Sequence, residues 1–223
     1  MNALIIFTKI PIEGFVKTRL IESIGEARAR DLAEAMLKDL LRRFESDIDY
    51  DILLFYTPED KLYMIEEYIS EYKAFPQIDG DLGSRMYYAM KMAFEMGYEK
   101  VTLIGSDIPE LGRRQVEDSM SKLDKSDIVF GPSADGGYYL IALKEANLSR
   151  DIFKISIVWG SGRVLDQSKK IAKSNELKID LVDELTDFDR EEDLDKIKDF
   201  DNIGENTKKI IVELFEKDWS AAK

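Results

Sequence analysis

Short apolar runs alternate with amphipathic segments along the chain, and this alternation constrains the fold more than any other feature of the sequence. The apolar runs predict buried strands over residues 3–7, 51–56, 101–104, 127–130 and 138–142. Apolar residues at helical spacing predict helices over residues 25–44, 59–71, 85–97, 113–123 and 162–174. Such alternation produces a mostly parallel sheet with right-handed crossovers and helices on both faces. We therefore expect an α/β fold with three layers, α/β/α.

Shorter elements complete the pattern: an extended piece at 76–78, a strand near 177–182, and helices near Glu191 and Asn206. Because no linker, internal repeat or low-complexity tract interrupts the 223 residues, we expect one domain over 1–223. The tail over 206–223 is expected to form a packing helix or a dimer helix, with Trp219 as its largest apolar anchor. A homodimer is therefore one alternative.

The loop that follows the first strand is locally positive, although the whole chain carries a formal charge of −13. Residues 9–20 include the cations Lys9, Lys17 and Arg19 and a single carboxylate, and Pro11 prevents a helix there. An extended backbone would direct Lys17 and Arg19 toward one point. Arginine forks and lysine ammonium groups both suit phosphate oxygens. The loop is predicted to bind phosphate; the alternative is a solvated loop with ordinary surface cations.

Cysteine and histidine are both absent from the sequence. Their absence excludes disulfides, thiolate nucleophiles, Ser-His-Asp catalysis and histidine-ligated metals. Acid–base and metal chemistry must then depend on carboxylates, lysines, tyrosines or the substrate itself. Carboxylate ligands favour hard cations such as Mg²⁺ or Mn²⁺.

The acidic balance and the hydropathy pattern restrict the partners. Duplex nucleic acid requires a broad basic face, whereas a small phosphorylated ligand requires only a local positive patch. No apolar run approaches the roughly 18 residues that span a bilayer, and no signal peptide is apparent at the N-terminus. We therefore expect no nucleic acid partner, no membrane association and a cytoplasmic protein.

Aspartates at two places could hold a metal ion. Asp107 follows the strand over 101–104, where a carboxylate can bind a divalent cation together with phosphate oxygens. The alternative is that Asp107 caps the following turn. Asp187 and Asp189 would point the same way in an extended segment, but Asp189 could instead cap a helix in a capping box with Glu192.

Two further polar loops are expected at the same edge of the sheet, since ligands bind beyond the carboxyl ends of the strands. Gly136 and Gly137 permit a backbone to approach a ligand closely, or they form a tight turn. The segment 80–85 opens a helix, and a helix N-terminus favours anions. Its Asp81 and Ser84 could instead be plain helix caps.

Ordered motifs in the chain resemble those of a known family. They are Lys9-x-Pro11-x-x-Gly14-x-x-Lys17-Thr18-Arg19-Leu20, Gly80-Asp81-Leu82-Gly83-x-Arg85-Met86, Gly105-Ser106-Asp107-Ile108-Pro109, Gly131-Pro132-x-x-Asp135-Gly136-Gly137-Tyr138-Tyr139-Leu140 and Asp187-x-Asp189-x-x-Glu192-Asp193-Leu194. In this order, over roughly residues 1–200, the motifs resemble the uncharacterised GT-A-like transferases labelled radical-SAM/selenodomain-associated transferase 1. That family is distantly related to phospholactate guanylyltransferase.

The resemblance implies a nucleotide-diphospho-sugar transferase fold that uses a nucleotide and a divalent metal, Mg²⁺ or Mn²⁺. By position, it implies that the catalytic residues are Lys17, Arg19 and Asp107. It implies nucleotide binding by Lys9, Lys17, Thr18, Arg19, Asp81 and Arg85, with the last two near the base or the second substrate. It implies acceptor binding by Asp135, Gly136, Gly137 and Tyr138, and metal binding by Asp107 with Asp187 or Asp189.

Two departures from related families bear on the reaction. The glycine-rich loop common in nucleotidyltransferases of this fold is missing, and the D-x-D motif of glycosyltransferases is replaced by Asp107-Ile108-Pro109. We predict metal-dependent transfer of a nucleoside monophosphate from a nucleoside triphosphate to a phosphorylated small molecule. The first alternative is glycosyl transfer from a nucleotide-sugar, and the second is a nucleotide-binding module without catalysis.

Overall fold

The computed structural model describes residues 1–46, 48–153, 162–196 and 200–215 of the 223-residue chain. Trp219, expected to anchor the C-terminal tail, lies outside the described residues. Among the helices in these ranges, none combines the length and the apolar character that crossing a membrane requires.

The described residues form one seven-stranded sheet with the strand order β3-β2-β1-β4-β6-β5-β7. The strands are β1 (Asn2–Lys9), β2 (Tyr50–Thr57), β3 (Lys73–Pro76), β4 (Lys100–Gly105), β5 (Ile128–Pro132), β6 (Tyr138–Lys144) and β7 (Ile179–Leu181). β1 is parallel to both β2 and β4, whereas β6 is antiparallel to both β4 and β5. The sheet is therefore mixed but mostly parallel, as the alternation predicted.

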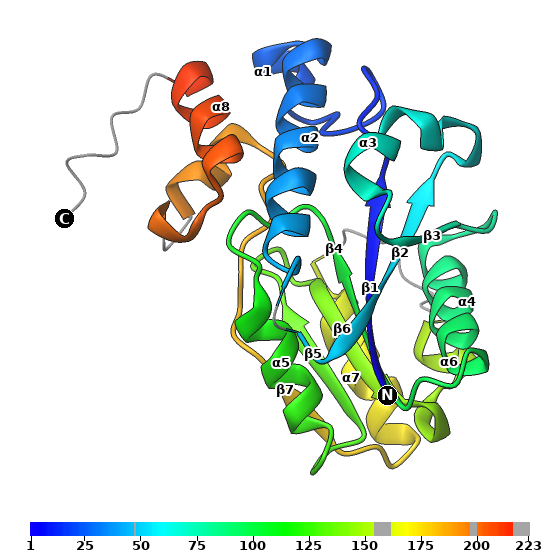
Figure 1. Ribbon diagram of the computed structural model, residues 1–223. Helices are drawn as coiled ribbons and strands as arrows, with labels where there is room; N and C mark the ends of the chain where they lie inside the picture. The colour runs from blue at the N-terminus through cyan, green and yellow to red at the C-terminus, as the bar shows by residue number, and fades with distance from the viewer. Residues whose placement is uncertain (47, 154–161, 197–199, 216–223) are drawn as a thin grey trace.

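Helices cover both faces of the sheet (Figure 1). The longer ones are α2 (Glu26–Arg42), α4 (Leu82–Glu95), α5 (Arg113–Lys122), α7 (Val164–Ser174) and α8 (Glu205–Phe215). Shorter ones are α1 (Ile21–Ile24), α3 (Glu66–Ile69) and α6 (Arg150–Phe153). The helices α2, α3 and α5 pack on one face, and α4, α6 and α7 pack on the other. The three-layer α/β/α prediction is confirmed.

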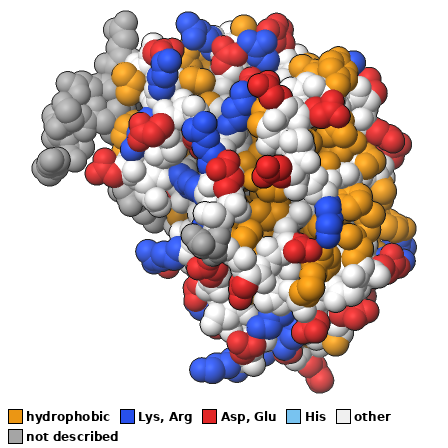
Figure 2. Space-filling view, viewed as in Figure 1, with side chains coloured by type: hydrophobic (Ala, Val, Ile, Leu, Met, Phe, Trp, Pro, Cys, Tyr) orange, Lys and Arg blue, Asp and Glu red, His pale blue; other side chains and the backbone are white. Residues whose placement is uncertain are grey.

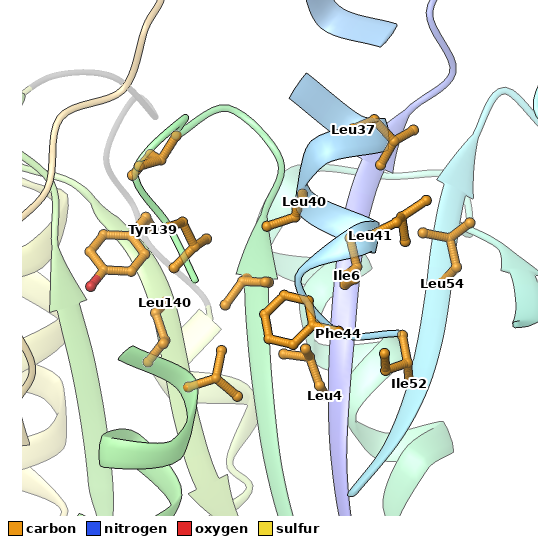
Figure 3. Close-up of a cluster of buried hydrophobic side chains, with 14 of the residues drawn as sticks. Leu4, Ile6, Leu37, Leu40, Leu41, Phe44, Ile52, Leu54, Tyr139 and Leu140 are labelled. Carbon is orange, nitrogen blue, oxygen red and sulfur yellow. The ribbon is translucent and has the colours of Figure 1, made fainter. Parts of the chain in front are cut away.

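Residues of β1 alternate between the two cores, which is why the strand is apolar without interruption from Ala3 to Phe7. Leu4 and Ile6 pack against Leu40 of α2 and against Phe44, which lies just beyond the end of that helix (Figure 3). Ile5 joins the other core, which contains the apolar side of α4. β1 lies between β2 and β4, so it is a central strand that is covered on both faces. Its carboxyl end therefore lies beside the carboxyl end of β4.

A third, smaller core joins α8 to α2. Its buried residues are Leu20, Leu32, Met36, Phe188, Leu194 and Ile211. Asp39 of α2 accepts hydrogen bonds from the backbone N–H groups of Asn206 (3.3 Å) and Thr207 (2.7 Å), and so caps the start of α8. The described part of the C-terminal tail is therefore a packing helix.

Two predicted helices differ from the observed elements. The segment expected as one helix over 59–71 is a 3₁₀ helix, η1 (Glu59–Met64), followed by the short α3. Ile65 separates them because it leaves helical geometry (φ −120°, ψ 0°), while its side chain is buried. The helix expected near Glu191 is also a 3₁₀ helix, η3 (Glu191–Lys196).

Candidate functional site

Three adjoining cavities lie beyond the carboxyl ends of the strands in the part of the chain that the structure describes. We call them the apolar cleft (about 350 Å³), the cationic cleft (about 230 Å³) and the acidic cleft (about 280 Å³). The apolar and cationic clefts share Thr8, Lys9, Ser106 and Asp107. The cationic and acidic clefts share Arg19 and Asp189. The three cavities therefore form one continuous candidate site.

The sheet topology places these residues together. β1 and β4 are parallel neighbours, so the residues that follow them meet at one edge. The hydroxyl groups of Thr8 and Ser106 are hydrogen bonded at 3.0 Å across this edge. Basic side chains gather with acidic neighbours in the upper half of the space-filling view, the half toward which β1 runs (Figures 1 and 2).

Lys17 is buried at the centre of the site. Its side chain is 1% exposed, and its Nζ lies 2.6 Å from Asp107 Oδ1 and 3.5 Å from Asp189 Oδ1. It also donates to the carbonyl oxygen of Phe188 at 2.8 Å. Burial alone would lower the pKa of Lys17, but the charges of Asp107 and Asp189 outweigh it and raise the pKa above its ordinary value.

Arg19 and Lys17 converge on the same carboxylate, although not through the extended backbone that the sequence suggested. Lys17 has a φ of +47°, so the chain turns there. Arg19, whose side chain is 54% exposed, places Nη1 3.2 Å from Asp189 Oδ2. Lys9 and Thr18 line the same cationic cleft. The residues predicted to bind phosphate are thus gathered in one cavity.

Asp107 is the carboxylate at the end of β4. Its side chain is 60% exposed, and the charge of Lys17 lowers its pKa. Its backbone carbonyl accepts a hydrogen bond from Phe188 N–H at 3.0 Å. This bond joins the end of β4 to the segment that carries the other two candidate metal ligands.

Asp187 has a strongly perturbed carboxyl group. Burial raises its pKa to about 7, and the negative charges of Asp135, Asp107 and Asp189 add to this effect. The Ser133 hydroxyl, which is hydrogen bonded to Asp187 Oδ2, acts in the opposite direction. Asp187 lines both the apolar and the acidic clefts, so it lies at their junction.

The side chain of Asp189 is paired with Lys17 and Arg19. Its backbone N–H is hydrogen bonded to Asp193, to which the sequence analysis gave no role. Asp193 Oδ2 accepts from the N–H groups of Asp189 (3.1 Å) and Arg190 (2.7 Å). The turn is therefore closed by Asp193, instead of a capping box between Asp189 and Glu192. An acidic residue at the third position of the helix, three residues after Arg190, was the available signal.

The donors available for a metal ion are carboxylate oxygens. Within the described ranges, no three acidic side chains are gathered as a ready-made metal site. However, Mg²⁺ needs only one or two carboxylates, because phosphate and water oxygens complete its shell. Asp107 and Asp187 lie close enough for their charges to interact, which fits such a cation.

The apolar cleft contains an arginine that is positioned by a residue the sequence analysis missed. Arg85 Nη1 donates to Gln77 Oε1 at 2.8 Å, and burial lowers the pKa of Arg85. Gln77 Nε2 donates to the carbonyl oxygens of Thr8 (3.0 Å) and Phe55 (2.9 Å), which fixes the orientation of its amide.

Asp81 is the N-terminal cap of α4, where its side chain accepts a hydrogen bond from Ser84 N–H at 2.8 Å. It does not line any of the three clefts.

The loop over 133–137 borders the acidic cleft. Asp135 lines it and accepts from Gly137 N–H at 2.8 Å. Gly136 has a φ of +84°, and a Cβ there would overlap the backbone of Gly162, so the packing of the chain itself requires glycine. Tyr138 lines the apolar cleft, where burial raises the pKa of its hydroxyl.

Comparison with known proteins identifies the family. Residues 40–161 match the model of a family described as an uncharacterized protein conserved in bacteria, DUF2064, and this match covers more than half of the chain. The chain belongs to this family. The finding agrees with the resemblance seen in the ordered motifs.

Curated relatives and a solved structure extend the comparison. A 2-phospho-L-lactate guanylyltransferase from Methanocaldococcus sp. (strain FS406-22) is 31% identical over 140 residues, 60% of this chain and 56% of the relative. One from Methanobrevibacter ruminantium is 28% identical over 151 residues, 62% of this chain and 64% of the relative. The chain thus spans less than two thirds of these relatives.

A crystal structure from Desulfovibrio desulfuricans G20, whose description proposes a nucleotide-diphospho-sugar transferase, matches with a TM-score of 0.86 and 28% identity. The match covers 95% of this chain and 94% of the chain from Desulfovibrio desulfuricans G20. The fold is therefore GT-A-like, as the motifs implied.

Proposed function

We propose that this protein is a metal-dependent nucleotidyltransferase, which moves a nucleoside monophosphate from a nucleoside triphosphate to a phosphorylated small molecule. The observation that carries the proposal is a cationic cleft that adjoins both an apolar cleft and an acidic cleft. Asp107 lies at the junction of the cationic and apolar clefts, and Asp187 lies at the junction of the apolar and acidic clefts. Similarity to guanylyltransferases over 60% of the chain supports it.

The cationic cleft is the proposed site of the triphosphate. Lys9, Thr18 and Arg19 line it and offer an ammonium, a hydroxyl and a guanidinium group to phosphate oxygens. Lys17 adds its charge, although protein oxygens accept its hydrogen bonds. These groups hold the reactants in line and stabilise the charge that develops during phosphoryl transfer.

The proposed reaction needs no histidine base. A phosphate oxygen of the acceptor, already ionised, forms a bond to the α-phosphorus, while the bond from that phosphorus to the bridging oxygen breaks. That oxygen leaves with the electron pair as pyrophosphate. The acidic cleft, with Asp135 at its edge and Arg19 at its junction with the cationic cleft, is the proposed place for the acceptor. Gly136 and Gly137 shape its loop, and Tyr138 borders the neighbouring cleft.

Asp107 and Asp187 are the proposed ligands of Mg²⁺ or Mn²⁺. Asp189 is less suited, since its two carboxylate oxygens already face Lys17 and Arg19. When bound, the metal would neutralise charge on the phosphates and polarise them.

The apolar cleft is the proposed site of the base, and guanine is the proposed base. Arg85 presents only hydrogen-bond donors, and its Nε is buried without a partner among the described residues. The O6 and N7 atoms of guanine are adjacent acceptors that match an arginine fork, whereas adenine offers a donor at N6. The guanylyltransferase names of the relatives support this choice.

Glycosyl transfer from a nucleotide-sugar is the second candidate, favoured by the description of the matching structure from Desulfovibrio desulfuricans G20. The two reactions differ in their products. In one set of reactions the protein is incubated with Mg²⁺, each nucleoside triphosphate and a panel of phosphorylated acids and sugars, and the release of pyrophosphate is measured. In a matched set, nucleotide-sugars replace the nucleoside triphosphates, and the release of nucleoside diphosphate is measured.

We expect acceptor-dependent pyrophosphate release that is lost in Asp107→Asn. Release of nucleoside diphosphate would instead establish glycosyl transfer. Nucleotide binding without either product would identify a binding module and contradict the proposal. Full activity of the Asp107→Asn variant would remove Asp107 from the mechanism.

A further inference from the structure

Lys17 has contacts that a lysine reserved for phosphate would not need. An ammonium group has three N–H donors. In the structure they face Asp107 Oδ1 at 2.6 Å, the Phe188 carbonyl at 2.8 Å and Asp189 Oδ1 at 3.5 Å. With its side chain 1% exposed, Lys17 directs its donors to protein oxygens.

These contacts connect three segments that are far apart in sequence. Lys17 belongs to the loop after β1, Asp107 follows β4, and Phe188 lies 171 residues from Lys17. The backbone bond from Phe188 N–H to the Asp107 carbonyl runs beside the same contacts. Lys17 has a positive φ, which is uncommon for a residue other than glycine. This backbone conformation belongs to the arrangement in which its side chain makes these contacts.

The carboxylates around Lys17 would repel one another without a cation between them. Asp107 and Asp189 both contact Lys17, and among the described carboxylates Arg19 pairs with Asp189, from the exposed side. We propose that Lys17 is a positioning residue, an internal counter-ion that fastens the segment 185–190 to the end of β4 in the ligand-free protein. Removal of its charge leaves a place that a divalent cation can occupy instead.

This role concerns the same site as the proposed function, but its test needs neither nucleotide nor turnover. Hydrogen exchange is followed by mass spectrometry in peptides that cover 185–190, in the wild type and in Lys17→Met, with and without millimolar Mg²⁺. Lys9→Met, a variant of an exposed lysine at the end of β1 that lines the same cleft, is the matched control.

We expect exchange in Lys17→Met to be faster by about tenfold or more without Mg²⁺, because hydrogen bonds to charged groups are among the stronger ones. Mg²⁺ restores most of the protection in this variant and changes the wild type and Lys9→Met by less than about twofold. The metal-dependent rescue distinguishes a counter-ion from a lysine that merely fills space. Unchanged exchange in Lys17→Met, or faster exchange that Mg²⁺ does not correct, would overturn the proposal.

A second measurement covers the case in which Lys17→Met does not fold. In the wild-type protein labelled with ¹⁵N-lysine, a buried and hydrogen-bonded ammonium group exchanges its protons slowly enough to give a resolved NMR signal. We expect that signal for Lys17 without ligand and expect it to persist in Mg²⁺ alone. Its absence in the well-folded wild type, with exchange as fast as that of surface lysines, would also overturn the proposal.

Discussion

Replacement of Asp187 by asparagine should make the metal-free protein more stable above neutral pH. Asparagine has nearly the shape of a protonated aspartate and can still accept a hydrogen bond from Ser133. The pKa of Asp187 is raised from 3.8 to about 7 by burial and by neighbouring carboxylates. At about 1.4 kcal/mol per pKa unit, the full shift corresponds to about 4 kcal/mol of unfavourable charge at alkaline pH. Because the side chain is partly exposed, we expect about half of that value.

The sign follows from the direction of the shift. The folded protein retains a proton on Asp187 between pH 4 and 7, where the unfolded chain has lost it. The corresponding stability is fully present below the unfolded pKa and is lost as pH rises through about 7. The difference in unfolding free energy between Asp187→Asn and wild type should therefore increase between pH 5 and 8.

Urea unfolding with EDTA at pH 5, 6, 7 and 8 measures this difference. We expect Asp187→Asn to exceed the wild type by about 2 kcal/mol at pH 8, and the two to approach each other at pH 5. Asp49→Asn, at an exposed aspartate outside the clefts, should show the pH profile of the wild type. Equal stability of Asp187→Asn and wild type at pH 8 would refute the argument that carboxylate crowding raises the energy of this site.

Other variants test separate parts of the account. Phe188→Ala should lower the free energy of unfolding by about 3–5 kcal/mol in urea melts, because it empties the small core under the Asp187–Asp189 segment. Gly136→Ala should lower it by more than about 2 kcal/mol, since a Cβ there meets the Gly162 backbone; a neutral effect would show that the loop is not constrained in this way. Gln77→Leu should weaken GTP binding about tenfold by calorimetry through loss of the Arg85 contact, and leave inorganic triphosphate binding unchanged. Equal losses for both ligands would place Gln77 outside base recognition.

Much of the fold was predictable because its strands and helices are marked by local periodicity. The mostly parallel sheet left the direction of β6 open, although the sequence contained a signal for its antiparallel direction. Only the loop over 133–137 joins β5 to β6, and a parallel connection needs a crossover of a dozen or more residues. The break of the 59–71 helix at Ile65 depends on burial against the core, which local spacing does not reveal.

The candidate site was predictable in its loops and not in its internal contacts. The motifs placed Asp107 and Arg19 at one edge of the sheet, where the structure has them. The burial of Lys17 depends on Phe188 and Asp189, which are separated from it by more than 170 residues. Gln77 has no motif around it, and its role arises only because β1 and β2 present carbonyl oxygens to its amide.

Binding of nucleoside triphosphates to the cationic cleft is the most direct test of the central claim. Thermal unfolding is measured with each nucleoside triphosphate and Mg²⁺, for the wild type, Arg19→Ala and the control Arg114→Ala, an exposed arginine on α5. A triphosphate at about 100 times its Kd should stabilise the wild type and Arg114→Ala by about 2.7 kcal/mol. Arg19→Ala should bind it more weakly by about 1.5–3 kcal/mol. If no triphosphate raises the Tm of the wild type, or if Arg19→Ala responds as the wild type does, the cleft is not a nucleotide site.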